Sequence, residues 1–269
     1  MTVFVVILLG CSFGVGFKLW ELRQARQRIE ALQARMHAPP AEIVTIRLAA
    51  DATIDSAFAA PAPTPPQGLA TQAETEEAAQ RRAKLQALRG ENAELVGWIK
   101  LDDTPIDYPV MQSVSRPWHY LDHDFEDERS KSGLPFIEEV CDISGNRANW
   151  IIYGHNMKNG TMFGGLHSLT EQAFYETHRI LQFDTPERAG SYKIVSVFYM
   201  VVDTGAGFQF YHYPNIESEE LFQTYADNVL SASIYPADTS LAWGDELLTL
   251  VTCSKHADDG RLVVVAKRV

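Results

Sequence analysis

The sequence predicts a mainly β domain, built as a β-sandwich or a closed barrel, that follows an N-terminal anchor helix and a spacer. From about residue 92 onward the chain consists of short runs rich in β-branched and aromatic residues, which are separated by Gly, Pro, Asp and Asn. Only two stretches with a helical pattern, residues 169–178 and 217–231, interrupt these runs. A charge-free segment at the N-terminus predicts the anchor.

The composition limits the classes of function. The chain has 269 residues and a formal net charge of −12. This charge argues against a general nucleic-acid binder, because such proteins neutralise phosphates with Lys and Arg. The three cysteines, Cys11, Cys141 and Cys253, cannot form a multi-disulfide framework, and the sequence has no CxxC pair of the kind found in zinc ribbons. A disulfide between Cys141 and Cys253 remains open at this point.

The N-terminal segment has the length and composition of a membrane span. Residues 1–17 carry no charge, and the apolar run continues past Lys18 to Trp20, near the lower end of the about 17–25 residues that a span needs. No small-x-small cleavage site follows, so we expect an uncleaved anchor over residues 1–20 rather than a signal peptide. The basic residues that follow would favour a cytoplasmic location for that side, and the sequence leaves this conflict open.

A juxtamembrane helix and a spacer connect the anchor to the domain. Residues 18–37 are rich in helix formers, and apolar residues recur there at roughly heptad spacing, which indicates a helix and a weak self-pairing stripe. The stripe consists of Leu22, Ile29, Leu32 and Met36. Residues 38–70 are dominated by Ala, Pro, Thr and Gln, a composition that cannot build a core. We therefore expect residues 21–70 to be helix and spacer, and residues 71–269 to be the folded domain.

The domain is predicted to open with a helix and to continue as strands. Thr71 and Glu74 have capping-box spacing, and Gly90 ends the helical pattern. Short β-type runs then occur up to the C-terminus, and the last two cover residues 247–252 and 262–266. A polar turn with Asp259-Gly260 as its breaker joins these last two runs.

This C-terminal hairpin brings a thiol and a cation together. Cys253 stands where the first strand ends, and Arg261 stands where the second begins. If the strands pair, the two side chains lie close together at one end of the sheet. A cation beside a thiol favours the reactive thiolate, which is what a nucleophile requires. The alternative is a buried structural cysteine with a surface arginine at a strand edge.

A nucleophilic thiol also needs a proton-transfer partner, and histidine is the usual one. His155 follows a predicted strand at residues 150–154 and opens a polar, glycine-containing loop, the position expected of a catalytic group on a rigid scaffold. His256 is a second candidate by its proximity to Cys253. We favour His155, because a residue three positions after the nucleophile would turn away from it.

The motifs YGHNMKNGTMFGGL (residues 153–166) and TLVTC (249–253), together with Arg261, resemble those of class B sortases. Residues 91–112 and 120–139 are also similar to that family, so the resemblance covers the chain from about residue 91 to the C-terminus. It implies a closed β-barrel of about eight strands with peripheral helices. It also implies a cysteine transpeptidase that acts on secreted proteins with a C-terminal sorting signal, without a cofactor.

The resemblance also implies roles for single residues. Cys253 would attack the carbonyl of the signal's threonine, and His155 would protonate the leaving amine and later deprotonate the incoming one. Arg261 would hold the substrate and stabilise the oxyanion. Thr252 either lines the substrate groove or is an ordinary β-branched strand residue. Asn156 is expected to contact substrate as well.

One stretch outside these motifs resembles a metal-ligand set. His119 and His123 are four residues apart and stand beside Asp122 and Asp124. The stretch belongs to a non-catalytic segment of the resemblance, so we expect no metal site there. The acidic run at residues 122–128 lacks an EF-hand pattern and reads as a solvated loop.

The expected protein is thus a single-pass membrane enzyme with its catalytic domain on the extracellular face. It would cleave a sorting signal after Thr through a thioacyl-enzyme and transfer the protein to an amine of a peptidoglycan precursor or a pilin. Two alternatives are a thiol endopeptidase that only hydrolyses its substrate and a non-catalytic, membrane-tethered binding module. A metal-dependent hydrolase that uses His119 and His123 is a further alternative.

Overall fold

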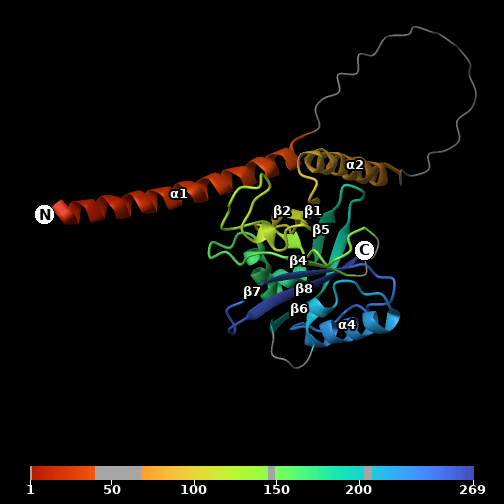
Figure 1. The fold of residues 1–269 in the computed structure, drawn as a ribbon. Coiled ribbons are helices and arrows are strands. Elements are labelled where there is room, and N and C mark those ends of the chain that lie inside the picture. Colours follow the sequence, from red (N-terminus) through yellow and green to blue (C-terminus); the bar gives the residue numbers. More distant parts are fainter. Residues whose placement is uncertain (1, 40–67, 145–148, 203–207) are drawn as a thin grey trace, which may run out of the picture.

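The computed structural model describes residues 2–39, 68–144, 149–202 and 208–269, without the side chains of residues 2–19 and 68–75. Eight strands form a closed barrel in the order β1-β2-β3-β4-β7-β8-β6-β5, and β5 pairs back with β1 (Figure 1). The strands are β1 (Leu95–Lys100), β2 (Asp107–Met111), β3 (Phe136–Ile137), β4 (Asn149–Tyr153), β5 (Ile180–Asp184), β6 (Ser191–Val201), β7 (Leu247–Cys253) and β8 (Gly260–Arg268).

Helices surround the barrel. The α-helices are α1 (Thr2–His37), α2 (Gly68–Glu91), α3 (Gln172–Thr177) and α4 (Glu219–Ala232). The shorter 3-10 helices are η1 (His119–Leu121), η2 (Phe163–Thr170) and η3 (Phe210–His212). The sequence left a sandwich and a barrel as alternatives, and the structure confirms the closed barrel with peripheral helices that the resemblance implies.

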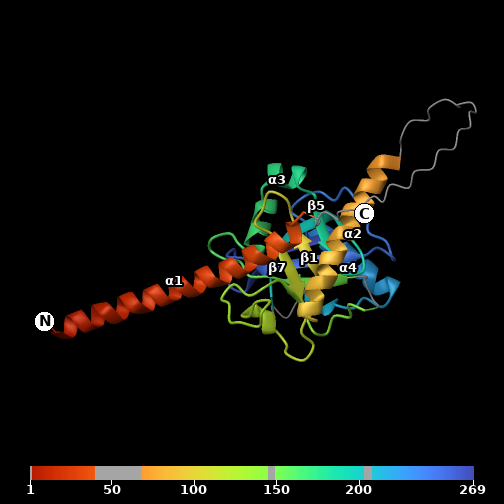
Figure 2. The ribbon, with the colours of Figure 1, turned by 90° about the horizontal axis from the view of Figure 1, so that it is seen from above.

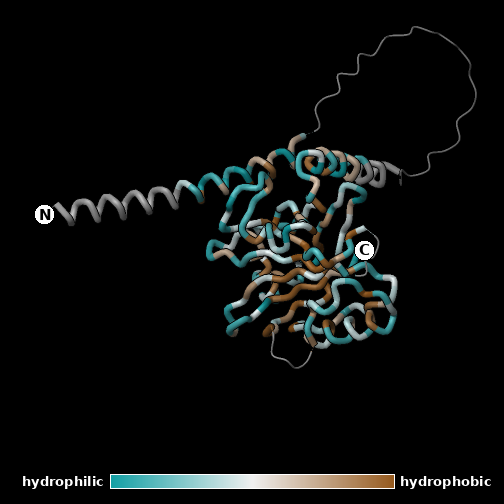
Figure 3. Tube along the Cα trace, in the orientation of Figure 1, coloured by the Kyte–Doolittle hydropathy of each residue, from teal (hydrophilic) through white to brown (hydrophobic). Residues whose placement is uncertain are grey.

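Strands β4, β6, β7 and β8 are apolar on both faces because each face packs against a different core. Along β7, Leu248 and Leu250 point into the barrel, whereas Leu247 and Val251 belong to a second cluster that α4 covers. Side chains on a strand alternate between its two faces, so burial on both faces produces a continuous apolar run rather than an alternating one. Hydrophobic residues accordingly concentrate in the barrel strands (Figure 3).

The C-terminal part of α1 packs on the barrel. Ile29, Leu32 and Met36 are buried in the main core, whereas Leu22 remains exposed. The self-pairing stripe predicted from the sequence is therefore wrong for these three residues, because covering the domain buries the same apolar face that a second helix would bury. Figure 1 and Figure 2 show α1 and α2 over the same end of the barrel.

Polar contacts fix α1 in this position. Arg28 forms an ion pair with the buried carboxylate of Asp124 at 2.6 Å, and the Gln33 side chain donates to the Asp107 carbonyl at 2.8 Å. The sequence placed the start of the folded part near residue 71. The structure extends the folded unit to the second half of α1, since these contacts join that half to β2 and to the segment between β2 and β3.

The predicted anchor at residues 1–20 falls almost wholly on residues 1–19, which lie outside the described side chains. In the part that the structure describes, no helix is long and apolar enough to cross a membrane. Most of the predicted spacer, residues 40–67, also lies outside the described residues.

The two helical stretches predicted within the domain are present with different bounds. Residues 169–178 are divided between η2 and α3, because Glu171 between them adopts an extended conformation. The stretch 217–231 corresponds to α4. Ser218 caps this helix by accepting a hydrogen bond from the Leu221 N–H at 3.2 Å.

A buried polar cluster joins α4 to β7 and β4. The Tyr225 and Thr249 hydroxyl groups are hydrogen-bonded to each other, and the Thr249 hydroxyl lies 2.7 Å from the Asn149 side-chain oxygen. All three side chains are inaccessible to solvent or nearly so. Their hydrogen bonds therefore replace those that water cannot supply.

Replacing Thr249 by Val should destabilise the protein. The change keeps the shape of the side chain but leaves the Tyr225 hydroxyl and the Asn149 oxygen without their shared partner, which costs about 1–3 kcal/mol of unfolding free energy. Denaturant titration would measure this loss. Thr224→Val on the exposed face of α4 serves as a control with an expected effect within about 0.5 kcal/mol. Equal stability of Thr249→Val and the wild type would contradict the role of the cluster.

Candidate active site

The site lies at the edge of the barrel where β4 and β7 end. These neighbouring strands are parallel, with Tyr153 opposite Val251 in the register. The pairing continues past the end of β4, because the Gly154 N–H donates to the Val251 carbonyl at 3.0 Å. Two residues further along each chain stand His155 and Cys253. Parallel pairing thus brings the ends of both segments to the same edge.

The third group of the site comes from β8. Cys253, the last residue of β7, is directly opposite Arg261 in the antiparallel β7–β8 pair. The Cys253 side chain is exposed and Arg261 is half-buried. One guanidinium nitrogen of Arg261 donates to the Gly260 carbonyl at 3.0 Å. The proximity that the hairpin pattern predicted is confirmed, and the thiol is not a buried structural cysteine.

A backbone carbonyl orients the ring of His155. The Nε2 atom lies 2.8 Å from the Leu121 carbonyl oxygen. A carbonyl oxygen only accepts hydrogen bonds, so Nε2 must carry a proton in this contact, and Nδ1 is the nitrogen left to exchange one. Leu121 was not predicted as a site residue, since a main-chain contact leaves no signal in the side chain.

The loop that begins at His155 is packed tightly against the end of β7. A Cβ atom on Gly154 would lie 2.6 Å from the Phe163 ring, so only glycine allows this approach. The Thr252 hydroxyl donates to the Gly154 carbonyl at 2.7 Å, and Thr252 is buried. Its side chain joins β7 to the loop.

Asn156 contacts the main chain of Cys253. Its side-chain amide donates to the Cys253 carbonyl at 2.9 Å and lies 3.0 Å from the His167 Nε2 atom. The His167 Nε2 atom is 3.3 Å from the same carbonyl. The side chains of Asn156 and His167 therefore both contact the carbonyl oxygen of Cys253. His167 was missed in the sequence, where nothing distinguishes it from the other histidines.

The sequence offered two further candidates, Cys141 and His256. Cys141 and Cys253 are both free, so the disulfide that the sequence left open is absent. Cys141 is buried, and burial raises the pKa of its thiol to about 12. His256 packs on the Tyr199 ring, with 4.8 Å between ring centroids, and its Nδ1 atom lies 3.1 Å from the Ser254 hydroxyl. This placement agrees with our preference for His155.

A groove of about 900 Å³ opens on the α1 side of the His155 loop. Arg26 and Ile29 of α1 line one wall. Lys131, Met157 and Thr161 come from the barrel loops on the other side. The groove thus lies beside the loop that carries His155.

One group of described side chains has the composition of a metal site. It consists of His119, His123 and Asp127. The aspartates considered in the sequence are engaged elsewhere: Asp124 pairs with Arg28, and Asp122 pairs with Arg129 as well as His123.

Comparison with known proteins identifies relatives of this chain. The family model described as a sortase domain matches residues 99–269. Sortase B of Staphylococcus aureus is 32% identical over 188 residues, which cover 69% of this chain and 75% of that protein. Sortase B of Listeria monocytogenes is 30% identical over 192 residues, which cover 70% of this chain and 75% of that protein.

Comparison with solved structures also finds sortase B proteins. The Staphylococcus aureus sortase B–substrate complex has a TM-score of 0.69 at 26% identity and covers 93% of this chain and 98% of that one. Clostridium perfringens sortase B has a TM-score of 0.62 at 28% identity, covering 68% of this chain and 98% of the other. A structure of sortase B complexed with triglycine has a TM-score of 0.68 at 25% identity, with coverage of 92% and 98%.

Iodoacetamide should modify Cys253 and spare Cys141 in the folded protein. Between about pH 7 and 9 the raised pKa of Cys141 keeps its thiol protonated, and burial covers it, whereas only an accessible thiolate reacts. Peptide mapping by mass spectrometry would locate the label. In guanidinium, Cys141 and Cys253 should both react. Equal labelling of these two residues in the native state would contradict the assignment of Cys253 as the accessible thiol and Cys141 as the buried one.

Proposed function

The chain belongs to the sortase family and is a class B cysteine transpeptidase, and from this premise we propose that it cleaves a C-terminal sorting signal after Thr through a thioacyl-enzyme. The main support for this proposal is the strand register, which puts Cys253 opposite Arg261 and level with His155 at one edge of the barrel. These are the residue types that a thiol acyl transfer requires: a nucleophile, an acid–base group and a cation for the oxyanion.

In the first half of the reaction, Cys253 Sγ attacks the carbonyl carbon of the scissile peptide bond. The carbonyl oxygen takes up negative charge, and the guanidinium of Arg261, which stands opposite Cys253 in the strand pair, stabilises it. The C–N bond then breaks, and His155 Nδ1 gives its proton to the leaving amine. The products of this half are a thioester on Cys253 and the released C-terminal fragment.

In the second half, an acceptor amine attacks the thioester carbon. His155 Nδ1, now neutral, takes the proton that the amine loses, and the C–S bond breaks to restore the thiolate. The Leu121 carbonyl keeps Nε2 protonated throughout, so the same nitrogen serves in both halves. The hydrogen bond from the Asn156 side chain to the Cys253 carbonyl holds the end of β7 in position between the two halves of the reaction.

Secreted proteins with a sorting signal are the proposed donors, and an amine of a peptidoglycan precursor or a pilin is the proposed acceptor. The triglycine complex of a relative supports an amine of the glycine type. The groove beside the His155 loop is the proposed binding place of the acceptor. We assign the acceptor to this groove because Met157 and Thr161 of its wall belong to the loop that His155 opens.

The proposed location is the extracellular face of the cell membrane, with residues 1–20 as a single-pass anchor. The charge-free sequence of residues 1–17 supports the anchor. The basic residues that follow raised a conflict of orientation. One of these basic residues, Arg28, forms an ion pair with the buried Asp124 carboxylate. Its positive charge therefore has a role within the folded domain.

The activity can be tested with the full chain in detergent, a set of sorting-signal peptides and triglycine. Mass spectrometry should find peptide cleaved after Thr and joined to triglycine. Cys253→Ala should abolish both cleavage and transfer. Arg261→Ala should lower the rate by about 10²–10³, the usual effect of losing an oxyanion donor.

Lys255→Ala is the matched control for Arg261→Ala. It removes a cation from the same turn but not from the position opposite Cys253. Its rate should stay near the wild-type value. Full activity of Cys253→Ala would overturn the mechanism, and cleavage with no triglycine product in the wild type would favour the endopeptidase alternative.

Thr161→Trp tests the acceptor groove. A bulky ring in the groove should lower the ratio of transfer to hydrolysis by about tenfold or more, equivalent to ~1.4 kcal/mol of acceptor binding, while cleavage of the donor continues. Thr177→Trp, at the exposed end of α3 and outside the groove, should leave the ratio unchanged. An unchanged ratio in Thr161→Trp would exclude the groove as the acceptor path.

A further inference from the structure

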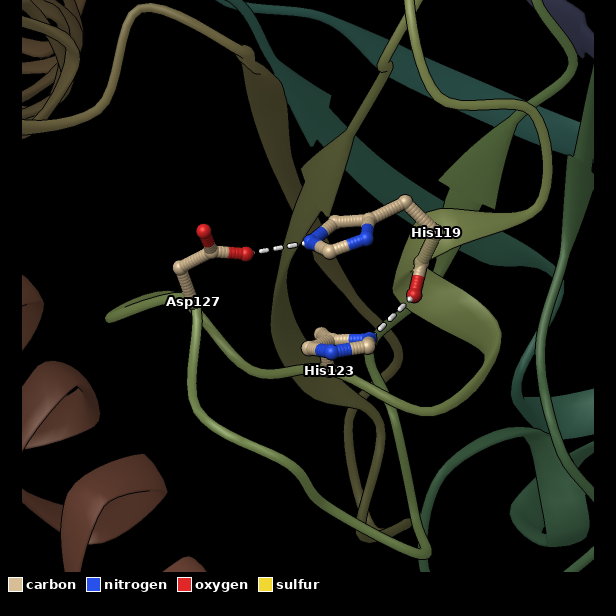
Figure 4. A group of neighbouring side chains, drawn as sticks. All are labelled: His119, His123 and Asp127. Carbon is tan, nitrogen blue, oxygen red and sulfur yellow. Dashed lines mark hydrogen bonds and ion pairs between the residues drawn. The ribbon is translucent and has the colours of Figure 1, made fainter.

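Three side chains between residues 119 and 127 converge beside the barrel (Figure 4). The His119 Nε2 atom is paired with the Asp127 carboxylate. The His119 and His123 rings stack with centroids 4.0 Å apart. One potential ligand atom from each of the three residues lies within 4.8 Å of the other two. Two imidazoles and a carboxylate form a donor set suited to zinc and related divalent metals.

The separation of these atoms is close to that of a metal site. Zinc binds nitrogen and oxygen at about 2.0–2.2 Å, so ligand atoms in a tetrahedral site are about 3.3 Å apart. The three side chains therefore have to close by no more than about 1.5 Å, which side-chain rotation provides. The rotation would unstack the two rings and let their nitrogens converge on one point.

The environment of His123 already matches that of a metal ligand. Its Nδ1 atom lies 2.7 Å from the Asp122 carboxylate and 3.1 Å from the His119 carbonyl oxygen. Both partners accept hydrogen bonds, so Nδ1 carries the proton and Nε2 keeps its lone pair. A carboxylate behind the histidine is the usual outer partner of a zinc-bound imidazole.

Asp127 is also prepared for this role. Arg116 donates to its two carboxylate oxygens at 2.8 and 3.0 Å. One oxygen can bind a metal while the other stays with Arg116, an arrangement that orients ligating carboxylates.

Exposure provides a path for the ion. The side chain of Asp127 is 56% exposed, whereas those of His119 and His123 are 10% and 18% exposed. The two histidines are thus on the protein side of the site, and Asp127 is on the side that faces solvent. Water from the open side can supply the remaining ligand of a four-coordinate ion.

We propose that His119, His123 and Asp127 bind one divalent metal ion of the zinc class. This site goes beyond the proposed function, which uses no metal. It also departs from our expectation for this stretch, because the third ligand is Asp127 rather than Asp122 or Asp124. Asp122 acts instead as the outer partner of His123.

The proposed metal site is connected to His155 through Leu121. Leu121 lies between the two proposed histidine ligands, and its carbonyl accepts the hydrogen bond from His155 Nε2. An ion held by His119 and His123 would fix this segment on both sides of Leu121. Metal binding would thus stiffen the support of His155 without touching the reacting atoms.

The test is zinc titration by calorimetry on the full chain without a histidine tag, in a Cys253→Ala background. That background removes the exposed thiol, which could itself bind zinc. One zinc ion should bind per chain and should raise the thermal unfolding midpoint. Asp122→Asn should weaken binding by about 10–100-fold as an outer partner, and His123→Ala and Asp127→Asn should weaken it at least as much.

His178→Ala is the matched control, since His178 pairs with Asp103 at 2.8 Å but has no second histidine beside it in the metal-like group. It should bind zinc like the parent. Midpoints in metal-free buffer would show that each variant folds, and Asp127→Asn, which is nearly isosteric and exposed, covers the case in which His123→Ala does not fold. The proposal is overturned if the parent shows no saturable binding, or if Asp127→Asn binds zinc as the parent does.

Discussion

The parallel pairing of β4 and β7 is the constraint on which the site depends. The two strands are far apart in sequence, yet their register places Tyr153 opposite Val251, so the segments beyond them emerge together at one edge. The hairpin partner β8 starts at that edge and supplies Arg261 opposite Cys253. A slip of one residue in either pairing would turn one of the three groups to the other face of the sheet. The rest of the structure makes such a slip costly.

Several features outside the site resist that slip. The β7 strand is apolar on both faces, and α4 covers the outer one, so a shifted register would disturb two cores at once. Thr249 ties β7 to Asn149 of β4 and to Tyr225 of α4 through buried hydrogen bonds. Past the end of β4, Thr252 and Asn156 continue the connection between the two segments with one hydrogen bond each to the opposite main chain. Stability and catalytic geometry therefore rest on the same strands.

The sequence predicted the parts of the molecule that local pattern determines. The C-terminal hairpin has strand-length apolar runs, a breaker at Asp259-Gly260 and functional residues at its ends, so its geometry followed directly. The position of α1 could not be predicted, because the spacing of Ile29, Leu32 and Met36 suits a second helix as well as the barrel surface. Leu121 was invisible because it acts through its carbonyl, and His167 because its neighbour Asn156 faces Cys253 only after β4 and β7 pair. The grouping of His119 and His123 with Asp127 rather than Asp124 depends on the path of the loop, which the sequence does not reveal.

The support of His155 comes from outside the pairing that positions Cys253 and Arg261. The thiol and the guanidinium belong to a rigid strand pair, whereas the imidazole is oriented by Leu121 in the segment between β2 and β3. That segment is in turn held by Arg28 of α1 through Asp124. The segment that contains Leu121 and Asp124 therefore connects α1, whose first half carries the proposed anchor, to His155. The proposed role of His155 as an acid–base group requires that its ring is held at the correct distance and angle, so the proposed metal ion and the contacts of α1 would act on the reaction through this segment.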